Sequence, residues 1–248
     1  KGIIINDVGI RKINALEFYR FTNLNDNSNI SNAFHNLTHV MYTTHTGHDL
    51  NSGYNISESR FQLLLGSLLL FGVGNPQFGT IFRNINTPWI HYDSGNERDV
   101  TNQDILNFDK TQKRKIESIF NSLNDIDFSK TENRFLDIAI RRFGSALSRT
   151  DNIDRFIDLM ISIESLLVSG SGETTVRLST RLSTLLAKND QQRIDYWLFA
   201  KKAYNVRSGI VHGEDLRSTE INGKTYTLEE ILNKLIDLTR ELIRIYLK

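Results

Sequence analysis

The sequence predicts a mainly α-helical protein, in which a helical bundle follows a mixed, mostly helical N-terminal region with one candidate short strand. From Thr131 to the end of the chain, apolar residues recur with a helical period, and no proline or long loop interrupts them. The part before Thr131 contains Asn-, Asp- and Ser-rich loops and both prolines. We therefore expect an accessory or sensor region over residues 1–130 and a helical domain over residues 131–248.

Four elements are expected in the N-terminal region. A β-branched run predicts a strand, and three segments with apolar residues at helical spacing predict helices. The strand is expected at residues 2–6, and the helices at about residues 33–47, 57–70 and 113–123. The segment 72–96 is rich in glycine and proline, and it predicts an irregular connection or a short hairpin.

Five helices are expected in the C-terminal region, at about residues 132–148, 152–168, 174–188, 192–212 and 228–247. The second is apolar on nearly all sides, which is typical of a central, buried helix. Gly213 favours a left-handed end to the fourth helix, and Thr227 with Glu230 has capping-box spacing at the start of the fifth. Asn222-Gly223 predicts a tight turn between these two helices.

The composition excludes several kinds of site. The chain has 248 residues, a formal net charge of +1 and no cysteine, so disulfides, zinc fingers and thiol nucleophiles are excluded. Its longest dense apolar run, residues 61–73, is too short to cross a bilayer, and the first residues lack a signal-peptide pattern. We therefore expect a cytoplasmic protein without a membrane partner. Because the net charge is near zero, a nucleic-acid surface requires local clustering of basic residues.

The segment 204–213 carries the pattern most suggestive of chemistry, in which four residues separate Arg207 from His212. The spacing alone is a weak signal, since roughly one chain of this length in three contains it by chance. Histidine transfers protons near neutral pH, and the planar guanidinium of arginine matches phosphate oxygens. Because RNA supplies its own nucleophile, the 2′-hydroxyl, such a pair needs no metal and no cofactor.

The geometry of this pair depends on the end of the helix. Side chains five residues apart on a regular helix diverge by about 140°. Arg207 and His212 would converge if the helix frayed at Gly209, or if two copies of the chain met at a dimer interface. An ordinary helix end is the alternative, because a cation near a helix C-terminus interacts favourably with the helix dipole.

Residues 132–248 resemble the HEPN superfamily, and within it the ApeA-like branch. The resemblance rests on residues 139–143, 154–167 and 177–186, and on the signature Tyr204-x-x-Arg207-Ser208-x-Ile210-Val211-His212-Gly213. It implies a helical bundle that dimerises so that paired motifs line one cleft. Many members are ribonucleases of toxin or antiphage systems, so the implied partners are RNA, a second copy of the chain, and an antitoxin or a phage-derived trigger.

The resemblance also implies roles for individual residues. Arg207 and His212 would be catalytic, Glu164 would support them from its helix, and Tyr204, Asn205 and Ser208 belong to the signature beside them. Some HEPN toxins carry a tyrosine two residues after the histidine. This chain has Glu214 there, so a modification specific to that tyrosine is not expected.

Glu164 has a second interpretation. It is the only acid in a long apolar helix stretch, and a buried carboxylate usually needs a partner. An ion pair with Arg181 or Arg207 is therefore as well supported as a catalytic role. An ion pair with Arg207 would orient the guanidinium. In that case the structural interpretation and the catalytic interpretation of Glu164 would hold together.

The sequence between residues 177 and 207 has seven basic residues and two acids, an excess that could hold a phosphate backbone. The candidates for RNA binding in this segment are Arg177, Arg181, Lys201 and Lys202. Tyr196, Trp197, Phe199 and Tyr204 interleave with them and could stack on bases. We favour a core position for Trp197 and Phe199, since aromatic residues at helical spacing more often pack inside.

Two further functions stay open. The bundle could be a dimerisation and nucleic-acid-binding module without catalysis. A metal-dependent activity is the other, because five potential ligands lie within fifteen residues: His35, His39, His45, His48 and Asp49. No HExxH pattern accompanies them, so we favour a polar helix face that continues into a loop.

Overall fold

The computed structural model describes most of the chain's second half and short parts of its first. The described residues are 3–5, 8–12, 39–42, 50–72, 81–84, 90–93, 110–168, 170, 172–213, 218–221 and 223–248. Among them the protein is mainly helical, as predicted, with three small antiparallel sheets. The chain forms two compact units. One comprises Lys1–Leu69 and Val73–Phe120, and the other Leu70–Gly72 and Asn121–Lys248.

The first unit contains a three-stranded sheet in the order β1 (Ile3–Ile5), β2 (Val8–Lys12) and β3 (His39–Tyr42). The predicted strand at residues 2–6 is confirmed by β1. The helix predicted over residues 33–47 is wrong at β3, where Met41 pairs with Ile10 across the strands. Cross-strand pairing of β-branched and aromatic residues overrides their local helical spacing there. The rest of that predicted helix lies outside the described residues.

Two helices and a hairpin complete the described part of this unit. Helix α3 (Leu50–Phe71) confirms the helix predicted at residues 57–70 and begins earlier, and α4 (Lys110–Asn124) confirms the one at 113–123. Its residues Ile116, Phe120 and Leu123 are buried, as their spacing on one face predicts. Strands β4 (Ile81–Asn84) and β5 (Ile90–Asp93) pair antiparallel, which supports the hairpin interpretation for these two strands. The residues between and beside them lie outside the described residues.

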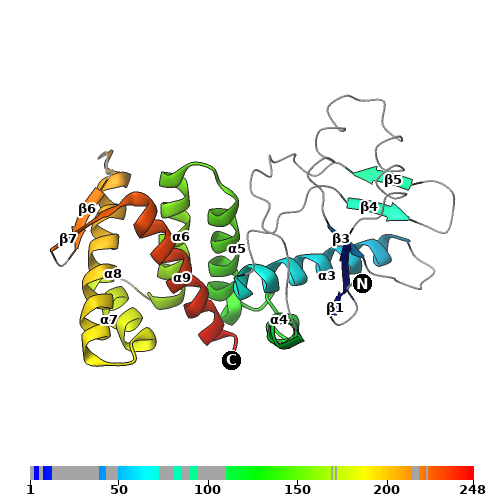
Figure 1. Ribbon diagram of the computed structural model, residues 1–248, viewed down its shortest axis with the longest axis horizontal. Helices are drawn as coiled ribbons and strands as arrows, with labels where there is room; N and C mark the ends of the chain where they lie inside the picture. The colour runs from blue at the N-terminus through cyan, green and yellow to red at the C-terminus, as the bar shows by residue number, and fades with distance from the viewer. Residues whose placement is uncertain are drawn as a thin grey trace. The chain divides into compact units, whose positions relative to one another are not determined.

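The second unit is a bundle of five helices, which confirms all five predictions (Figure 1). They are α5 (Arg134–Ser148), α6 (Asn152–Leu167), α7 (Thr174–Leu186), α8 (Asp190–Val211) and α9 (Leu228–Tyr246), and the short 3-10 turn η1 (Thr131–Asn133) precedes them. Helix α6 packs against the other four and buries side chains on several sides, as predicted for a central helix. None of the described helices is long and apolar enough to cross a membrane.

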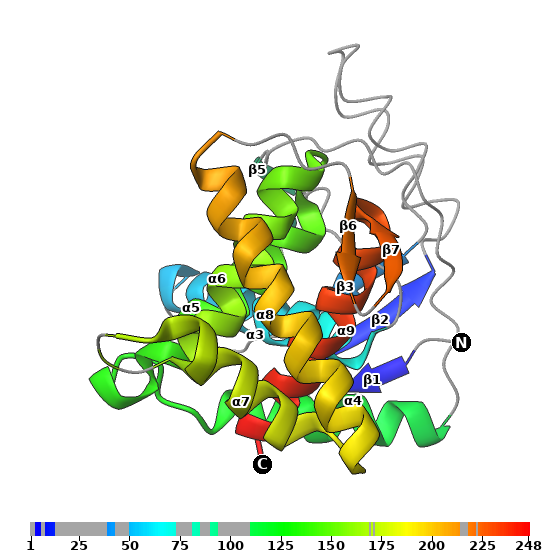
Figure 2. The same ribbon diagram turned by 90° about the vertical axis from the view of Figure 1, so that its left-hand side faces the viewer.

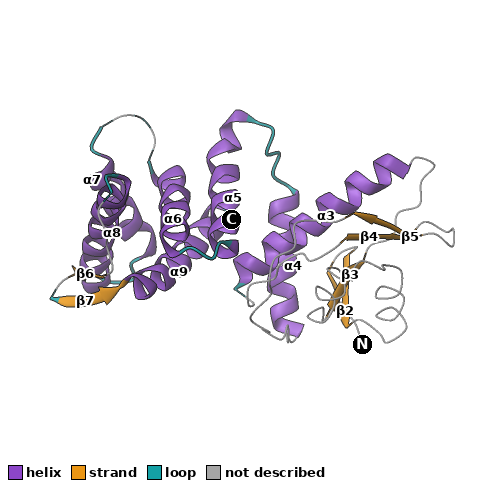
Figure 3. Cartoon of the chain, turned by 90° about the horizontal axis from the view of Figure 1, so that it is seen from above, coloured by secondary structure: helices purple, strands orange, loops and turns teal. Residues whose placement is uncertain are grey.

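Local signals at the helix ends are realised as predicted. Thr227 and Glu230 form the reciprocal capping box of α9, and Gly213 has φ +88° just after α8. Gly223 also has positive φ, and it joins two strands that the sequence did not predict, β6 (Ser218–Ile221) and β7 (Lys224–Thr227). This hairpin packs on α8 through β6 and on α9 through β7 (Figure 3).

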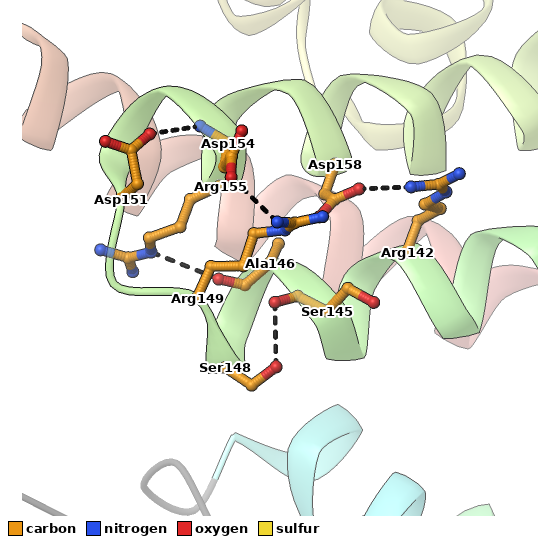
Figure 4. Close-up of polar contacts among 9 residues, drawn as sticks. All are labelled: Arg142, Ser145, Ala146, Ser148, Arg149, Asp151, Asp154, Arg155 and Asp158. Atoms are coloured by element: carbon orange, nitrogen blue, oxygen red, sulfur yellow. Dashed lines mark hydrogen bonds and ion pairs between the residues drawn. The ribbon is translucent and has the colours of Figure 1, made fainter. Parts of the chain in front are cut away.

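A buried carboxylate holds α5 to α6. The side chain of Asp158 is 2% exposed and accepts hydrogen bonds from Arg142 Nη1 at 2.8 Å and from Arg149 Nε at 2.5 Å (Figure 4). Arg149 also reaches Asp154 at 2.9 Å. The contact with Asp158 raises the pKa of Arg149. Two guanidiniums from α5 and the turn after it thus offset the cost of burying one charge on α6.

Substitution of this carboxylate should destabilise the protein. Asp158→Asn is expected to lower the free energy of unfolding by about 2 kcal/mol, because two charged hydrogen bonds are lost while both arginines can still reach water. Asp154→Asn is the matched control, since Asp154 shares Arg149 but is 57% exposed, and it should cost at most about 0.5 kcal/mol. Urea unfolding followed by circular dichroism measures both, and equal effects would contradict the role given to Asp158.

Candidate functional site

Helix α8 carries both residues of the Arg-x4-His pattern. Its N-terminus is capped by Asn189, whose side chain accepts a hydrogen bond from the backbone of Gln192 at 2.9 Å. One face packs into the unit through Phe199, Ala200, Ala203, Val206 and Gly209. The helix lies at an outer side of the bundle, beside α7 and in front of α6 in Figure 2. Its other face is therefore available for contact with a ligand.

The residues of α8 opposite the packed face form a continuous line, which we call the α8 stripe. It consists of Trp197, Lys201, Tyr204, Asn205, Ser208 and His212, all of them exposed or half-buried. At 100° per residue they fall within about 100° of one another around the helix axis. The backbone N–H of His212 donates to Ser208 and Gly209 at 3.1 and 3.0 Å, so the helical course continues to the histidine.

Arg207 lies about 60° beyond the nearest edge of this stripe, on the packed side of α8, and faces Glu164 of α6. Its Nε is 3.5 Å from Glu164 Oε1, and the two side chains are 28% and 23% exposed. Both of these atoms are buried, and neither makes a hydrogen bond. The Nη nitrogens of Arg207 are not buried in this way and make no hydrogen bond with the described residues. The guanidinium is thus held at one end and open at the other.

The predicted ion pair of Glu164 is therefore formed with Arg207 and not with Arg181. Arg181 Nη1 instead donates to the carbonyl of Leu167, at the C-terminal end of α6, at 2.5 Å. Burial raises the pKa of Glu164, and the positive charge of Arg207 partly opposes this effect. The carboxylate is consequently only partly compensated, which is consistent with a contact that positions Arg207 more than it stabilises the fold.

His212 is exposed at the end of α8, and its ring makes no hydrogen bond or ion pair with the described residues. Of the two ways in which the sequence would bring it to Arg207, fraying at Gly209 is not realised, because Gly209 is buried within the helix. Five residues along this helix the two side chains point about 140° apart. Regular helix geometry therefore turns the two side chains away from each other within one chain, and their approach at a dimer interface stays a prediction.

The four residues predicted to bind RNA do not share one helix face. Lys201 is exposed on the α8 stripe, whereas Lys202, about 100° further around the helix, is half-buried. Arg177 and Arg181 belong to α7, and Arg181 is engaged with the end of α6. The basic residues that lie close together in the sequence are thus divided between two helices, α7 and α8.

The two aromatic residues predicted to be core differ. Phe199 is fully buried, as predicted. Trp197 is only half-buried and lies on the α8 stripe, so the core prediction fails for it. The Lys201 ammonium lies 5.0 Å from the centroid of the Trp197 ring.

Sequence reasoning missed Lys234 of α9. Its ammonium lies 4.2 Å from the ring centroid of Phe199, 5.9 Å from that of Tyr226 and 6.0 Å from that of Tyr196. Burial lowers the pKa of this half-buried lysine. These cation–π contacts join α9 to α8 and to the β6–β7 hairpin. No local signal indicates them, because the rings come from separate elements.

Only His39 of the N-terminal histidine cluster lies within the described residues. It belongs to β3, so the favoured interpretation of a polar helix face is wrong at His39, and so is the helical spacing of His39 with His35 that a metal site would use. The other members of the cluster, His35, His45, His48 and Asp49, lie outside the described residues. Within the described ranges, no group of three or more His, Cys, Asp or Glu side chains could hold a metal ion.

No protein-family model matches the chain, and no curated protein and no solved structure matches it either. The resemblance of residues 132–248 to HEPN proteins therefore stays an expectation that rests on the quoted segments. The function has to be argued from the arrangement of Glu164, Arg207 and His212.

The partly compensated charge of Glu164 should show in the pH dependence of stability. A carboxyl whose pKa is raised by folding holds its proton more tightly in the folded state, so its contribution is present at low pH and is lost as the pH rises through the folded pKa. Wild type should therefore lose stability relative to Glu164→Gln as the pH rises above 4.5, the ordinary pKa of this carboxyl.

Urea unfolding of both proteins across this pH range measures the effect. Arg207→Gln is the matched variant: removing the opposing charge should move the loss to higher pH. Parallel stability curves for wild type and Glu164→Gln would show that the carboxyl is not perturbed.

Proposed function

We propose that this protein is a metal-independent endoribonuclease that acts as a homodimer, with Arg207 and His212 as its catalytic residues. The observation that carries the proposal is the state of Arg207. Glu164 lies against its Nε from a neighbouring helix, while its Nη nitrogens stay open on the same helix that ends in an exposed histidine. A guanidinium held in this way is suited to two oxygens of one phosphate.

The proposed reaction uses only groups that the protein and the RNA supply. His212 takes the proton of a 2′-hydroxyl, whose oxygen attacks the adjacent phosphorus. Arg207 stabilises the negative charge of the pentavalent phosphorane. The bond to the 5′-oxygen then breaks, and that oxygen receives a proton from the imidazolium. The products are a 2′,3′-cyclic phosphate and a 5′-hydroxyl, and the histidine returns to its neutral form.

Dimerisation is part of the proposal because one chain does not complete the site. Arg207 and His212 diverge around α8, but they lie within about 8 Å of each other along its axis. Two copies that meet near the C-terminal end of α8 would place two arginines and two histidines around one cleft. This arrangement is also what the HEPN resemblance implies. On the same resemblance, we propose a role in a toxin-type or antiphage system, with the N-terminal region as the part that responds to a trigger.

A second candidate function is a dimerisation and nucleic-acid-binding module without catalysis. It is favoured by the same ion pair, because Glu164 also gives Arg207 a structural reason to be present. In this case His212 would be an exposed residue at a helix end, and RNA would bind without turnover.

Cleavage of single-stranded RNA in the presence of EDTA tests the proposal. Wild type should cleave, whereas His212→Ala and Arg207→Ala should each lose at least about 100-fold in rate, because proton transfer and charge stabilisation act in the same step. Arg193→Ala is the control, since Arg193 is an exposed cation of α8 that pairs with Asp190. It should cleave like wild type.

Two readouts separate the candidates. Mass spectrometry of the fragments should find 2′,3′-cyclic phosphate ends. Activity that EDTA abolishes, or that survives both substitutions, would contradict the mechanism. Tight RNA binding without turnover, unchanged by His212→Ala, would favour the binding module.

A further inference from the structure

Trp197 is only partly covered by the fold. Phe199, two residues further on, points about 160° away around the helix and is fully buried. Trp197 lies on the opposite side, along the α8 stripe, and is only half-buried. The exposed part of the indole leaves apolar surface in contact with water, which is unfavourable in free energy. A polar side chain at this position would avoid this unfavourable contact. Its ring is therefore available to a ligand.

The cation over this ring has no acidic partner in the described part of the chain. The Lys201 ammonium lies 5.0 Å from the Trp197 ring centroid and makes no ion pair with the described residues. Asp195, the nearest acid along the helix, accepts a hydrogen bond from Gln191 instead. Lys201 thus keeps its ammonium donors, which lie over one face of the ring, for an anion that approaches from solvent.

The pair lies in line with His212, whereas Arg207 points about 80° to one side of Trp197 around the helix. Trp197 is about 15 Å from Arg207 and about 22 Å from His212 along the helix axis, at 1.5 Å per residue. Between them the stripe presents a phenol, an amide and a hydroxyl from Tyr204, Asn205 and Ser208. These groups can stack on bases or hydrogen-bond to their edges. A few nucleotides of an extended strand would span this distance.

We propose that Trp197 and Lys201 form a subsite for one nucleotide of single-stranded RNA, with the base stacked on the indole and the adjacent phosphate held by the ammonium. The inference rests on the proposed ribonuclease for its ligand, and it places the strand along α8 from Trp197 towards His212. Single strands are the favoured ligand because a base inside a duplex cannot stack on a side chain. The unmatched charge of Lys201 favours RNA over a second copy of the chain as the group that covers this ring.

Binding of a short single-stranded RNA with 2′-O-methyl riboses tests the subsite, since this probe has no free 2′-hydroxyl and is not cleaved. Fluorescence anisotropy at fixed salt should find about 5- to 100-fold weaker binding by Trp197→Ala, the range expected for the loss of one stacked base. Trp197→Phe should retain most of the affinity. Lys201→Gln should reduce the slope of affinity against salt by about one phosphate contact.

Ile194→Ala is the matched control. Ile194 is 54% exposed, less than one turn before Trp197 on the same side of α8, but it has no aromatic ring. It should bind the probe like wild type, and circular dichroism should confirm that all variants are folded. Sedimentation velocity of the same variants tests whether a second copy of the chain covers this surface instead. If Trp197→Ala and Ile194→Ala both shift the oligomeric mass, this part of α8 is a contact between copies, and the proposal is overturned.

The remaining outcomes are equally decisive. Unchanged binding by Trp197→Ala, or no binding of the probe by wild type, would overturn the subsite. Failure of the nuclease proposal would look different: wild type would not cleave unmodified RNA, while Trp197→Ala would still weaken binding of the 2′-O-methyl probe.

Discussion

The contact between Glu164 and Arg207 is the interaction on which the candidate site depends. It joins α6 to α8 through Nε alone, at 3.5 Å and without a hydrogen bond, so the other end of the guanidinium stays open. A bidentate ion pair would occupy two nitrogens of the guanidinium with the carboxylate, and these nitrogens could then not bind a phosphate. With no acid at this position, the guanidinium would lose its orientation. The weak contact therefore suits a group that has to be positioned and yet remain available.

Helix α6 carries two acids whose charges are compensated to different degrees. Asp158, near its start, is 2% exposed and hydrogen-bonded by two arginines, so its charge is well compensated. Glu164, less than two turns later, has one distant partner, and burial raises its pKa. Both carboxylates face guanidiniums, but only Asp158 accepts hydrogen bonds from them. Incomplete compensation of a buried charge is common where a side chain serves a reaction or a ligand.

The proposed nuclease and the proposed nucleotide subsite use the same geometric property of α8. One face of this helix is anchored in the bundle by small and apolar residues, and the other carries aromatic, basic and hydrogen-bonding groups in one line. A rigid helix keeps such groups in register with an extended strand better than a loop would. The divergence of Arg207 and His212 around the axis explains why the proposed active form needs a second copy.

The five helices of the second unit could be predicted from the amino-acid order alone, as could the capping box at Thr227, the helix end at Gly213 and the buried position of Phe199. These features depend on neighbours three or four residues away, and such local contacts are encoded directly in the order of the residues. Three other features became visible only in the folded chain: residues 39–42 form a strand, Glu164 meets Arg207 and not Arg181, and Trp197 stays half-buried. Each of these depends on residues distant in the chain, whose packing, pairing and desolvation exist only once the elements have come together.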